Sequence, residues 1–393
     1  MAPPPASPHV VVVGSGLAGH GVLRELRKHA PDARLTLVTH DEGHFYSKPA
    51  LSTALAKGKT ADTLVTIPGC KVAAQLNIDL RAGREAEAID TAGQVLLTTG
   101  GPIAYDALVL ALGADPIRPA IAGDGALRAL SVNSLEQYRI FRDAVSANAR
   151  VLIMGGGLVG TEFANDLSAS GYRPVVVDML EYPLAQLVPA EVGDAIRAAL
   201  ADKGVEWHLG RRIVAIHKDG AGIRAELDDG VTIAADVVLS AVGLRPRIQI
   251  AQDAGLDVGR GIKVDAMGCT SNAHIFAIGD CAEYLHGPSA YVTPIMAAAR
   301  AIASSVLGTP TEIRFPPLSV QVKTTACPVV LLPAPVGAQG RWERDACDEA
   351  GLKYLFRDLA GTVLGYVLTH DKCQERTALD QSLSTLMTHK EPV

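Results

Sequence analysis

Short apolar runs alternate with amphipathic stretches along most of the chain. The run HVVVV at 9–13 is followed by a glycine-rich turn and a helical pattern at 20–30, and a second apolar run covers 33–40. Such runs are typical of parallel strands buried on both faces, and a helix must connect strands of this kind. The pattern predicts an α/β fold. Many glycines and few aromatic residues favour tight βα turns over an all-β sandwich.

The same order of apolar run, glycine turn and helical pattern recurs at 149–179, about 140 residues further along. This is an internal repeat at the scale of a domain rather than a solenoid repeat. Apolar runs at 105–113 and 235–243 each end in a glycine with proline soon after, as expected of strands that leave a domain. We therefore predict boundaries near 117 and 244, and a third near 314, where RFPPLS follows.

The carboxy-terminal third begins with a strongly marked helix. Thr293 suits its N-cap, Pro294 its first position and Gly308 its end. The β-like runs after 315 and a closing helix at 375–387 predict a small α+β domain. The Pro- and Gly-rich segment 332–342 is expected to be a hairpin loop.

Two glycine-rich loops carry the clearest chemical signal. Each follows a predicted strand and opens a predicted helix, the context in which GxGxxG binds a dinucleotide. The first glycine permits the tight turn, the second lets the backbone approach a pyrophosphate, and the third lets helix and strand pack closely. The loops consist of Gly14, Gly16 and Gly19, and of Gly155, Gly157 and Gly160. Two loops suggest two dinucleotides, FAD and a nicotinamide cofactor.

The residues after each loop bear on which nucleotide it binds. Asp178 ends the second unit's strand, where a carboxylate accepts hydrogen bonds from a ribose 2′-OH and repels a 2′-phosphate. No arginine follows in DMLEYPL, which favours NADH over NADPH. In the first unit Thr39 stands where an acid is usual, and Asp41 comes two residues later. The Thr39 hydroxyl and the His40 main chain remain able to reach a ribose.

Composition and charge narrow the function further. The formal net charge is −6, which disfavours nucleic acid as a partner. The amino-terminal residues show no secretory signal, and no apolar run has the roughly 20 residues that cross a bilayer, so we predict a cytoplasmic protein. The six cysteines form no CxxC or CxxxxC pair, so we expect no redox dithiol and no metal site.

These motifs together resemble the FAD/NAD-linked pyridine nucleotide reductases of the glutathione-reductase type, in their ferredoxin and rubredoxin reductase branch. The resemblance spans nearly the whole chain. It implies an FAD domain in two segments, 1–117 and 245–314, with an NADH domain at 118–244 between them and a small domain at 315–393. Its anchors are VVGSGLAG, YSKPALS, LVLALGA, GGGLVGTEFANDL, SAVGLRPR, IFAIGDCAE and VKTTACP.

The resemblance also implies which residues contact the cofactors. Lys48 and Glu162 would lie beside the isoalloxazine as the catalytic pair. Glu85 and Val292 would make main-chain contacts, and Lys323 would approach the ring from the last domain. The FAD set is Gly14, Ser15, Gly16, Leu17, Ala18, Gly19, Thr39, His40, Lys48, Pro49, Glu85, Gly113, Glu162, Asp280, Val292 and Lys323. The NADH set is Gly155, Gly157, Gly160, Asp178 and Gly243.

Each charged residue in this set also has an ordinary structural interpretation. Asp280 follows an apolar strand, where ligands of α/β sheets bind, but it could equally cap the next turn. Lys48 precedes a proline, which favours an extended backbone, and its ammonium would stabilise charge arriving at the flavin. Glu162 suits a first helical turn through the helix dipole alone, or pairs with Lys48. A lysine such as Lys323, on a strand, usually faces solvent.

The segment FYSKPALS, at 45–52, carries no cysteine where disulfide reductases of this fold keep one. Electrons reaching the flavin would then leave it directly, which suits a one-electron acceptor such as rubredoxin or a similar small acidic iron–sulfur protein. A [2Fe–2S] ferredoxin, a flavorubredoxin and O₂ remain alternative acceptors. A redox sensor that binds FAD and NADH without turnover is the alternative of another class. We expect a monomer.

Overall fold

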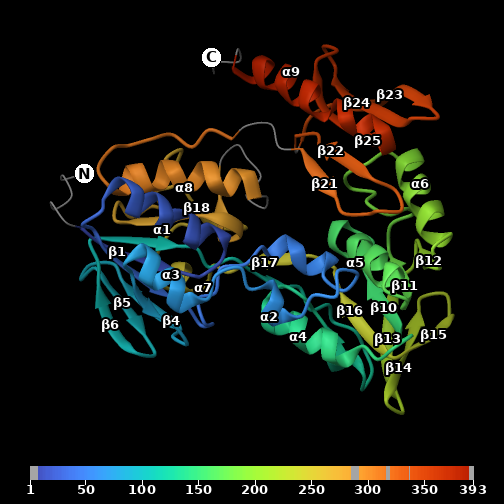
Figure 1. Ribbon diagram of the computed structural model, residues 1–393, viewed down its shortest axis with the longest axis horizontal. Helices are drawn as coiled ribbons and strands as arrows, with labels where there is room; N and C mark the ends of the chain where they lie inside the picture. The colour runs from blue at the N-terminus through green and yellow to red at the C-terminus, as the bar shows by residue number, and fades with distance from the viewer. Residues whose placement is uncertain (1–7, 285–291, 316–318, 336, 389–393) are drawn as a thin grey trace. The chain divides into compact units, whose positions relative to one another are not determined.

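The computed structural model describes residues 8–284, 292–315, 319–335 and 337–388 (Figure 1). The chain divides into two compact units. The first unit consists of 1–48, 65–115 and 244–316, and the second of 49–64, 116–243 and 317–393. Both predicted strand–helix–strand repeats are present, one in each unit, and the α/β fold class is confirmed.

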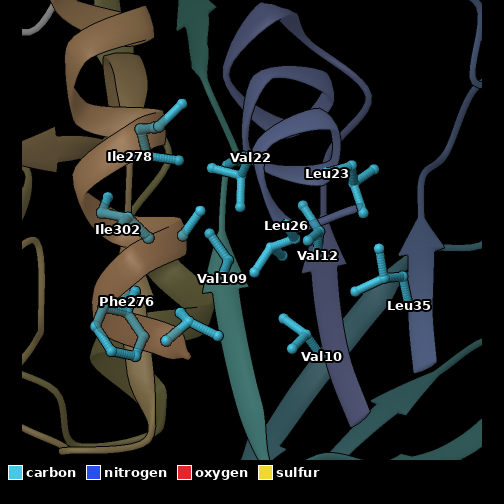
Figure 2. Close-up of a cluster of buried hydrophobic side chains, with 14 of the residues drawn as sticks. Val10, Val12, Val22, Leu23, Leu26, Leu35, Val109, Phe276, Ile278 and Ile302 are labelled. Carbon is cyan, nitrogen blue, oxygen red and sulfur yellow. The ribbon is translucent and has the colours of Figure 1, made fainter. Parts of the chain in front are cut away.

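The first unit is built on a parallel five-stranded sheet in the order β19-β7-β1-β2-β3. The strands are β1 (His9–Val13), β2 (Arg34–Val38), β3 (Asp79–Arg81), β7 (Ala107–Leu110) and β19 (Ile275–Ala277), and the helices α1 (Leu17–His29) and α8 (Val292–Val306) pack on one face. Figure 2 shows Val22 of α1 and Ile302 of α8 directed toward Val109 of the sheet. Gly21 permits this close helix packing, because a Cβ there would lie 3.3 Å from the Ala299 side chain.

The other face of this sheet packs against an antiparallel sheet. Ile89 and Leu96 of that small sheet are buried with Val11 and Leu108 of the large one. Its strands are β4 (Ala86–Asp90), β5 (Val95–Thr98) and β6 (Gly101–Ala104). The remaining elements of the unit are α3 (Gly69–Leu76), α7 (Gln249–Asp253), β18 (Ile262–Lys263), η3 (Gly279–Cys281) and β20 (Ala282–Glu283), with β17 (Leu244–Pro246) and β8 (Ala114–Pro116) at its edge.

The second unit contains the repeated sheet, again parallel, in the order β12-β11-β10-β16-β9. Its strands are β9 (Ala129–Leu130), β10 (Arg150–Met154), β11 (Arg173–Asp178), β12 (Glu206–Leu209) and β16 (Val237–Ser240). An antiparallel sheet of β13 (Ile213–Asp219), β14 (Gly222–Leu227) and β15 (Thr232–Ala235) packs on it. The helical segments are η1 (Lys48–Thr53), whose first residue belongs to the first unit, α2 (Ala61–Leu64), η2 (Ala126–Arg128), α4 (Leu135–Ala144), α5 (Leu158–Ala169) and α6 (Ala190–Ala201).

The last part of the second unit is an antiparallel sheet in the order β21-β22-β25-β24-β23. Its strands are β21 (Val320–Val322), β22 (Val329–Leu332), β23 (Gly340–Asp348), β24 (Gly351–Asp358) and β25 (Val363–Thr369), followed by η4 (His370–Glu375) and α9 (Arg376–Thr388). Leu383 of α9 packs on the buried Val330 and Leu368. The closing helix and the α+β character are as predicted.

The predicted hairpin loop at 332–342 is wrong. β22 pairs with β21 and β25 rather than with β23, so the segment after Leu332 crosses the sheet to its far edge. The reason is burial: all four residues of β22 are buried and suit a central strand, whereas β23 is mostly polar and exposed and suits an edge.

Helix α8 differs slightly from its expected start. Its described range begins at Val292, so Thr293 lies inside the first turn rather than at the N-cap, and the side chains of both residues are outside the described part. Gly308 follows the helix with φ of 86°, the left-handed conformation expected of a glycine after a helix end. Within the described residues, no helix is long and apolar enough to span a membrane.

Candidate functional site

The first glycine-rich loop has a backbone that only glycine can form and an open space in front of it. Gly14 has φ of 111°, and a Cβ there would lie 2.2 Å from the Ala111 carbonyl oxygen. A Cβ on Gly19 would lie 1.9 Å from the Gly14 oxygen, whereas nothing lies within 4 Å of one on Gly16. The free N–H groups at the start of α1 attract a phosphate. The loop therefore fits a pyrophosphate.

The second loop repeats this geometry in the second unit. Gly155 has φ of 101°, and a Cβ there would lie 2.7 Å from the Ala241 oxygen. A Cβ on Gly160 would lie 1.9 Å from the Gly155 oxygen, and the space around Gly157 is open to at least 4 Å. Each unit thus carries one loop with the same three glycine roles, and both loops fit a dinucleotide.

Asp178 lies at the end of β11, beside the second loop. One of its carboxylate oxygens accepts a hydrogen bond from the Gly156 N–H, and the other accepts one from the Leu180 N–H at 2.7 Å. These bonds hold the carboxylate against the loop. Val159 and Met179, from the segments around it, are exposed apolar side chains, Met179 by 69%. An acid beside exposed apolar groups suits a ribose next to an adenine ring.

In the first unit the acid missing at position 39 is replaced by Asp41. Its Oδ1 accepts hydrogen bonds from Ser15 Oγ and Thr39 Oγ1, both at 2.7 Å, and from the Gly43 N–H at 2.9 Å. Burial opposes ionisation, but these hydrogen bonds outweigh it and hold the pKa of Asp41 below its usual value. Sequence reasoning noted Asp41 but did not assign it to the site. Its position two residues after Thr39 was the available signal.

Lys48 pairs with Asp280 within the first unit. Lys48 Nζ lies 3.7 Å from Asp280 Oδ2, and burial lowers the pKa of Lys48 while it raises the pKa of Asp280. Lys48 is the first residue of η1, so the extended conformation expected before proline does not hold there. Asp280 lies in η3, directly after Gly279, whose φ is 77°.

Glu162 pairs with Lys323 within the second unit, and the Lys48–Glu162 pair, which would join the two units, stays a prediction. Glu162 is only 2% exposed, and its Oε2 accepts hydrogen bonds from Lys323 Nζ at 2.8 Å and from Ser52 Oγ at 2.5 Å. Its Oε1 accepts the Lys323 N–H at 3.2 Å. A buried carboxylate needs such partners. Lys48 meets its need for an anion at Asp280.

The same face of α5 carries two further polar residues that sequence reasoning missed. Asp166 is 1% exposed and accepts the Leu55 and Ala56 N–H groups at 2.9 and 3.0 Å. Asn165 Oδ1 accepts the Ala326 N–H at 3.2 Å. The spacing of Glu162, Asn165 and Asp166 at i, i+3 and i+4 was the signal that they share a face. Through them α5 holds two distant segments of the second unit in place.

The other predicted contact residues have ordinary positions. Leu17 and Ala18 open α1, His40 is exposed after β2, and Pro49 is the second residue of η1. Gly113 and Gly243 follow β7 and β16 with φ of 71° and 116°. The Glu85 N–H donates to Thr99 Oγ1, and its carbonyl oxygen accepts the Thr99 N–H, so an adenine contact would need the carbonyl's second lone pair. Val292 begins α8, and its side chain lies outside the described residues.

The cysteines are all free thiols. Cys281 and Cys327 are buried, and burial raises the pKa of each to about 11. Cys70 and Cys347 are exposed, on α3 and β23. A raised pKa leaves little of the nucleophilic thiolate at neutral pH, so the two buried thiols are poor candidates for redox chemistry.

Comparison with protein families gives two matches. Residues 8–304 match the pyridine nucleotide-disulphide oxidoreductase family, and residues 312–383 match a family described as the rubredoxin binding C-terminal domain.

Curated relatives align over nearly the whole chain. The rubredoxin-NAD(+) reductase of Alcanivorax borkumensis is 43% identical, over 96% of this chain and 99% of the relative. The enzyme of the same name from Acinetobacter baylyi is 38% identical, over 91% and 93%. The nitric oxide reductase FlRd-NAD(+) reductase of Aeromonas salmonicida is 36% identical, over 93% and 94%.

Solved structures share the fold. A ferredoxin reductase from Rhodopseudomonas palustris superposes with a TM-score of 0.86 at 25% identity, over 94% of this chain and 93% of the other. Putidaredoxin reductase, in its covalent complex with putidaredoxin, gives 0.87 at 24% identity, over 97% and 94%.

Proposed function

Because the chain belongs to the pyridine nucleotide-disulphide oxidoreductase family, we propose that it is an FAD-dependent enzyme that passes electrons from NADH to rubredoxin. The observation that carries the proposal is the pair of open glycine loops, one in each unit, combined with the rubredoxin-binding family match at 312–383. FAD, when bound, accepts the electron pair of a hydride and releases electrons singly. The rest of the proposal concerns what the chain's own residues contribute.

The two loops divide the cofactors between the units. We assign FAD to the loop of Gly14, Gly16 and Gly19, where Asp41 orients the Ser15 and Thr39 hydroxyls. We assign NADH to the second loop, because the Asp178 carboxylate is held beside it by main-chain N–H groups. An acid in this place accepts ribose hydroxyls and repels a 2′-phosphate, so NADH is the expected donor rather than NADPH.

Lys48 supplies positive charge to the flavin site. Its ammonium lies beside Asp280, and the lowered pKa of Lys48 reports burial that the acid only partly offsets. The Lys48 side chain is 37% exposed, so its charge stabilises negative charge that develops near it, but less than a fully buried cation would. Asp280 keeps Lys48 in one place and is itself a candidate for a polar contact with the cofactor.

Glu162, the second proposed catalytic residue, acts by anchoring. It fixes Lys323, which follows β21, and Ser52, which lies in η1. Lys323 belongs to the part of the chain that matches the rubredoxin-binding domain. Glu162 therefore ties that domain to helix α5. The first turn of the same helix is part of the second glycine loop, to which we assign NADH.

The acceptor assignment rests on the carboxy-terminal match and on the names of the relatives. Rubredoxin carries one electron, which suits a flavin with no cysteine near it at 45–52. A flavorubredoxin is the second candidate, because the FlRd-NAD(+) reductase of Aeromonas salmonicida is 36% identical to this chain. We further propose an acidic partner, a monomeric and cytoplasmic enzyme, and the domain division at 117, 244 and 314.

Replacing Lys48 tests the proposal most directly. We expect Lys48→Met to retain FAD but to slow reduction of the bound flavin by NADH roughly tenfold, the loss of a partly exposed electrostatic contact. Stopped-flow absorbance of the flavin at saturating NADH measures the rate. The matched control is Lys71→Met, which removes an exposed lysine of α3 and should leave the rate unchanged. Equal rates in both variants would contradict the role of Lys48.

A further inference from the structure

A cation that the local sequence does not reveal lies beside the acid of the second loop. β11 and β12 are parallel neighbours, with Asp178 opposite Leu209 in register. Two residues past Leu209, the Arg211 N–H donates a hydrogen bond to the Asp178 carbonyl oxygen at 2.9 Å. Strand pairing thus puts an arginine at the ribose end of the loop, although none follows Asp178 in the chain.

This arginine is already engaged by another acid. Arg211 Nε lies 2.7 Å from Asp229 Oδ2, in the turn between β14 and β15. Asp229 Oδ1 accepts the Val231 N–H at 3.1 Å, which fixes the carboxylate within its own turn. The turn is also held against the arginine's segment, because the Asp228 N–H donates to the Arg212 carbonyl oxygen at 3.0 Å. The ion pair is therefore held by the backbone on both sides.

The charge around this arginine decides what it can bind. A guanidinium presents a fork of N–H donors that matches the oxygens of a phosphate, and arginines supply this contact where a 2′-phosphate is recognised. An arginine held by a carboxylate is neutralised and has donors occupied. A second acid lies close by, since the Glu181 carboxylate oxygens lie 3.0 and 3.1 Å from where a Cβ on Gly210 would be.

We propose that Asp229 is a specificity-determining residue, which withholds Arg211 from the nucleotide site and so strengthens the preference for NADH over NADPH. The inference rests on the proposed use of NADH at the second loop. It adds a negative determinant to the carboxylate of Asp178: discrimination comes from repelling the 2′-phosphate and also from occupying the nearby cation that would attract it. Asp229 acts through Arg211 and contacts no nucleotide itself.

Asp229→Asn tests this with little risk to the fold. Asp229 is exposed, and the asparagine oxygen can still accept the Val231 N–H. We expect the dissociation constant for NADPH to fall about fivefold, the effect of one exposed ion pair, with that for NADH changed less than about twofold. Anaerobic titration calorimetry of the protein with its FAD already reduced, so that no hydride transfer accompanies binding, measures both constants, and the ratio of kcat/KM values should shift in the same direction.

Two controls separate release of Arg211 from a general loss of negative charge. Asp219→Asn removes an acid that pairs with Arg224 at 3.4 Å, at the far end of the β13–β14 hairpin, and should not change the NADPH constant. Asp229→Asn combined with Arg211→Gln should lose the gain in NADPH affinity, as a double-mutant cycle requires for coupled residues.

The outcomes distinguish this inference from the proposed function. The role of Asp229 would be overturned by unchanged NADPH affinity in Asp229→Asn, or by an equal gain in NADPH affinity in the double variant. Neither result would contradict NADH binding at the second loop. An unaltered protein that binds neither nucleotide would overturn the assignment of the second loop and this inference with it.

Discussion

At the scale of single residues, His20 is a fully buried titratable side chain whose ring nitrogens lack hydrogen-bond partners. It is 0% exposed and lies in the first turns of α1. Its ring packs edge-on against Phe45, with centroids 5.4 Å apart, and Arg24 lies 4.0 Å above the same Phe45 ring. Burial lowers the pKa of His20 to about 4, so the imidazole is neutral at pH 7.

This residue should make the folded protein sensitive to acid. Between pH 6.5 and 4 the unfolded chain takes up a proton at His20 that the folded chain does not, so stability is full above 6.5 and falls as pH falls. The free energy of unfolding should be lower at pH 4 than at neutral pH by about 3 kcal/mol on account of this residue. Urea unfolding of His20→Leu and of the unaltered protein at pH 4.5 and 7.5 measures it. The same pH dependence in both would contradict the prediction.

At the scale of elements, helix α5 does more than present a glycine loop. Its buried polar face holds η1 through Glu162 and Ser52, the segment after η1 through Asp166, and the segment after β21 through Lys323 and Asn165. The strand–helix unit that carries the second glycine-rich loop therefore also orders two connecting segments. Burial raises the pKa of Asp166 to about 6, above its usual value of 3.8.

Asp166 should oppose the pH dependence of His20. Its folded-state pKa lies above the unfolded one, so its contribution is full below pH 3.8 and is lost as pH rises through about 6. Asp166→Asn should remove a decline of about 2–3 kcal/mol in unfolding free energy between pH 4 and 7. Urea unfolding at several pH values measures it. The control is Asp62→Asn, which removes an exposed acid paired with Arg139 and should keep the decline in unfolding free energy. The same decline in Asp166→Asn would contradict the prediction.

At the scale of the whole molecule, the electron route should bypass every thiol. The described cysteines are free, and burial raises the pKa of the Cys269, Cys281 and Cys327 thiols to about 11, which leaves little thiolate at neutral pH. Since a hydride carries two electrons and rubredoxin accepts one, two rubredoxins should be reduced for each NADH that is oxidised.

Alkylation of the accessible thiols tests this route. Iodoacetamide should modify the exposed Cys70 and Cys347, leaving the rate of rubredoxin reduction and the stoichiometry unchanged. Because the proposed partner is acidic, the rate should also fall as salt rises. Stopped-flow absorbance of rubredoxin gives rate and stoichiometry together. Loss of activity with FAD still bound would instead indicate a reactive cysteine on the route.

The sequence by itself determined the features that are local in the chain. Apolar runs, glycine spacing and turn residues act within about twenty positions, so both strand–helix–strand units, both glycine-rich loops and the closing helix could be predicted. The acids after two of those strands are also visible in the sequence, because Asp178 follows an apolar run directly and Asp280 follows one after a single glycine. The absence of a cysteine at 45–52 is likewise a fact of the sequence alone.

Only the tertiary structure decided which distant residues meet. Lys48 has Asp280 as its partner and Glu162 has Lys323, because an ion pair depends on where the fold brings opposite charges together, and a chain with 36 basic and 42 acidic residues offers many alternatives. The position of β22 between β21 and β25 follows from burial of its four apolar side chains, which a local turn signal cannot overrule. Arg211 lies beside Asp178 for the same reason: parallel strand pairing, which no local pattern encodes, aligns the ends of β11 and β12.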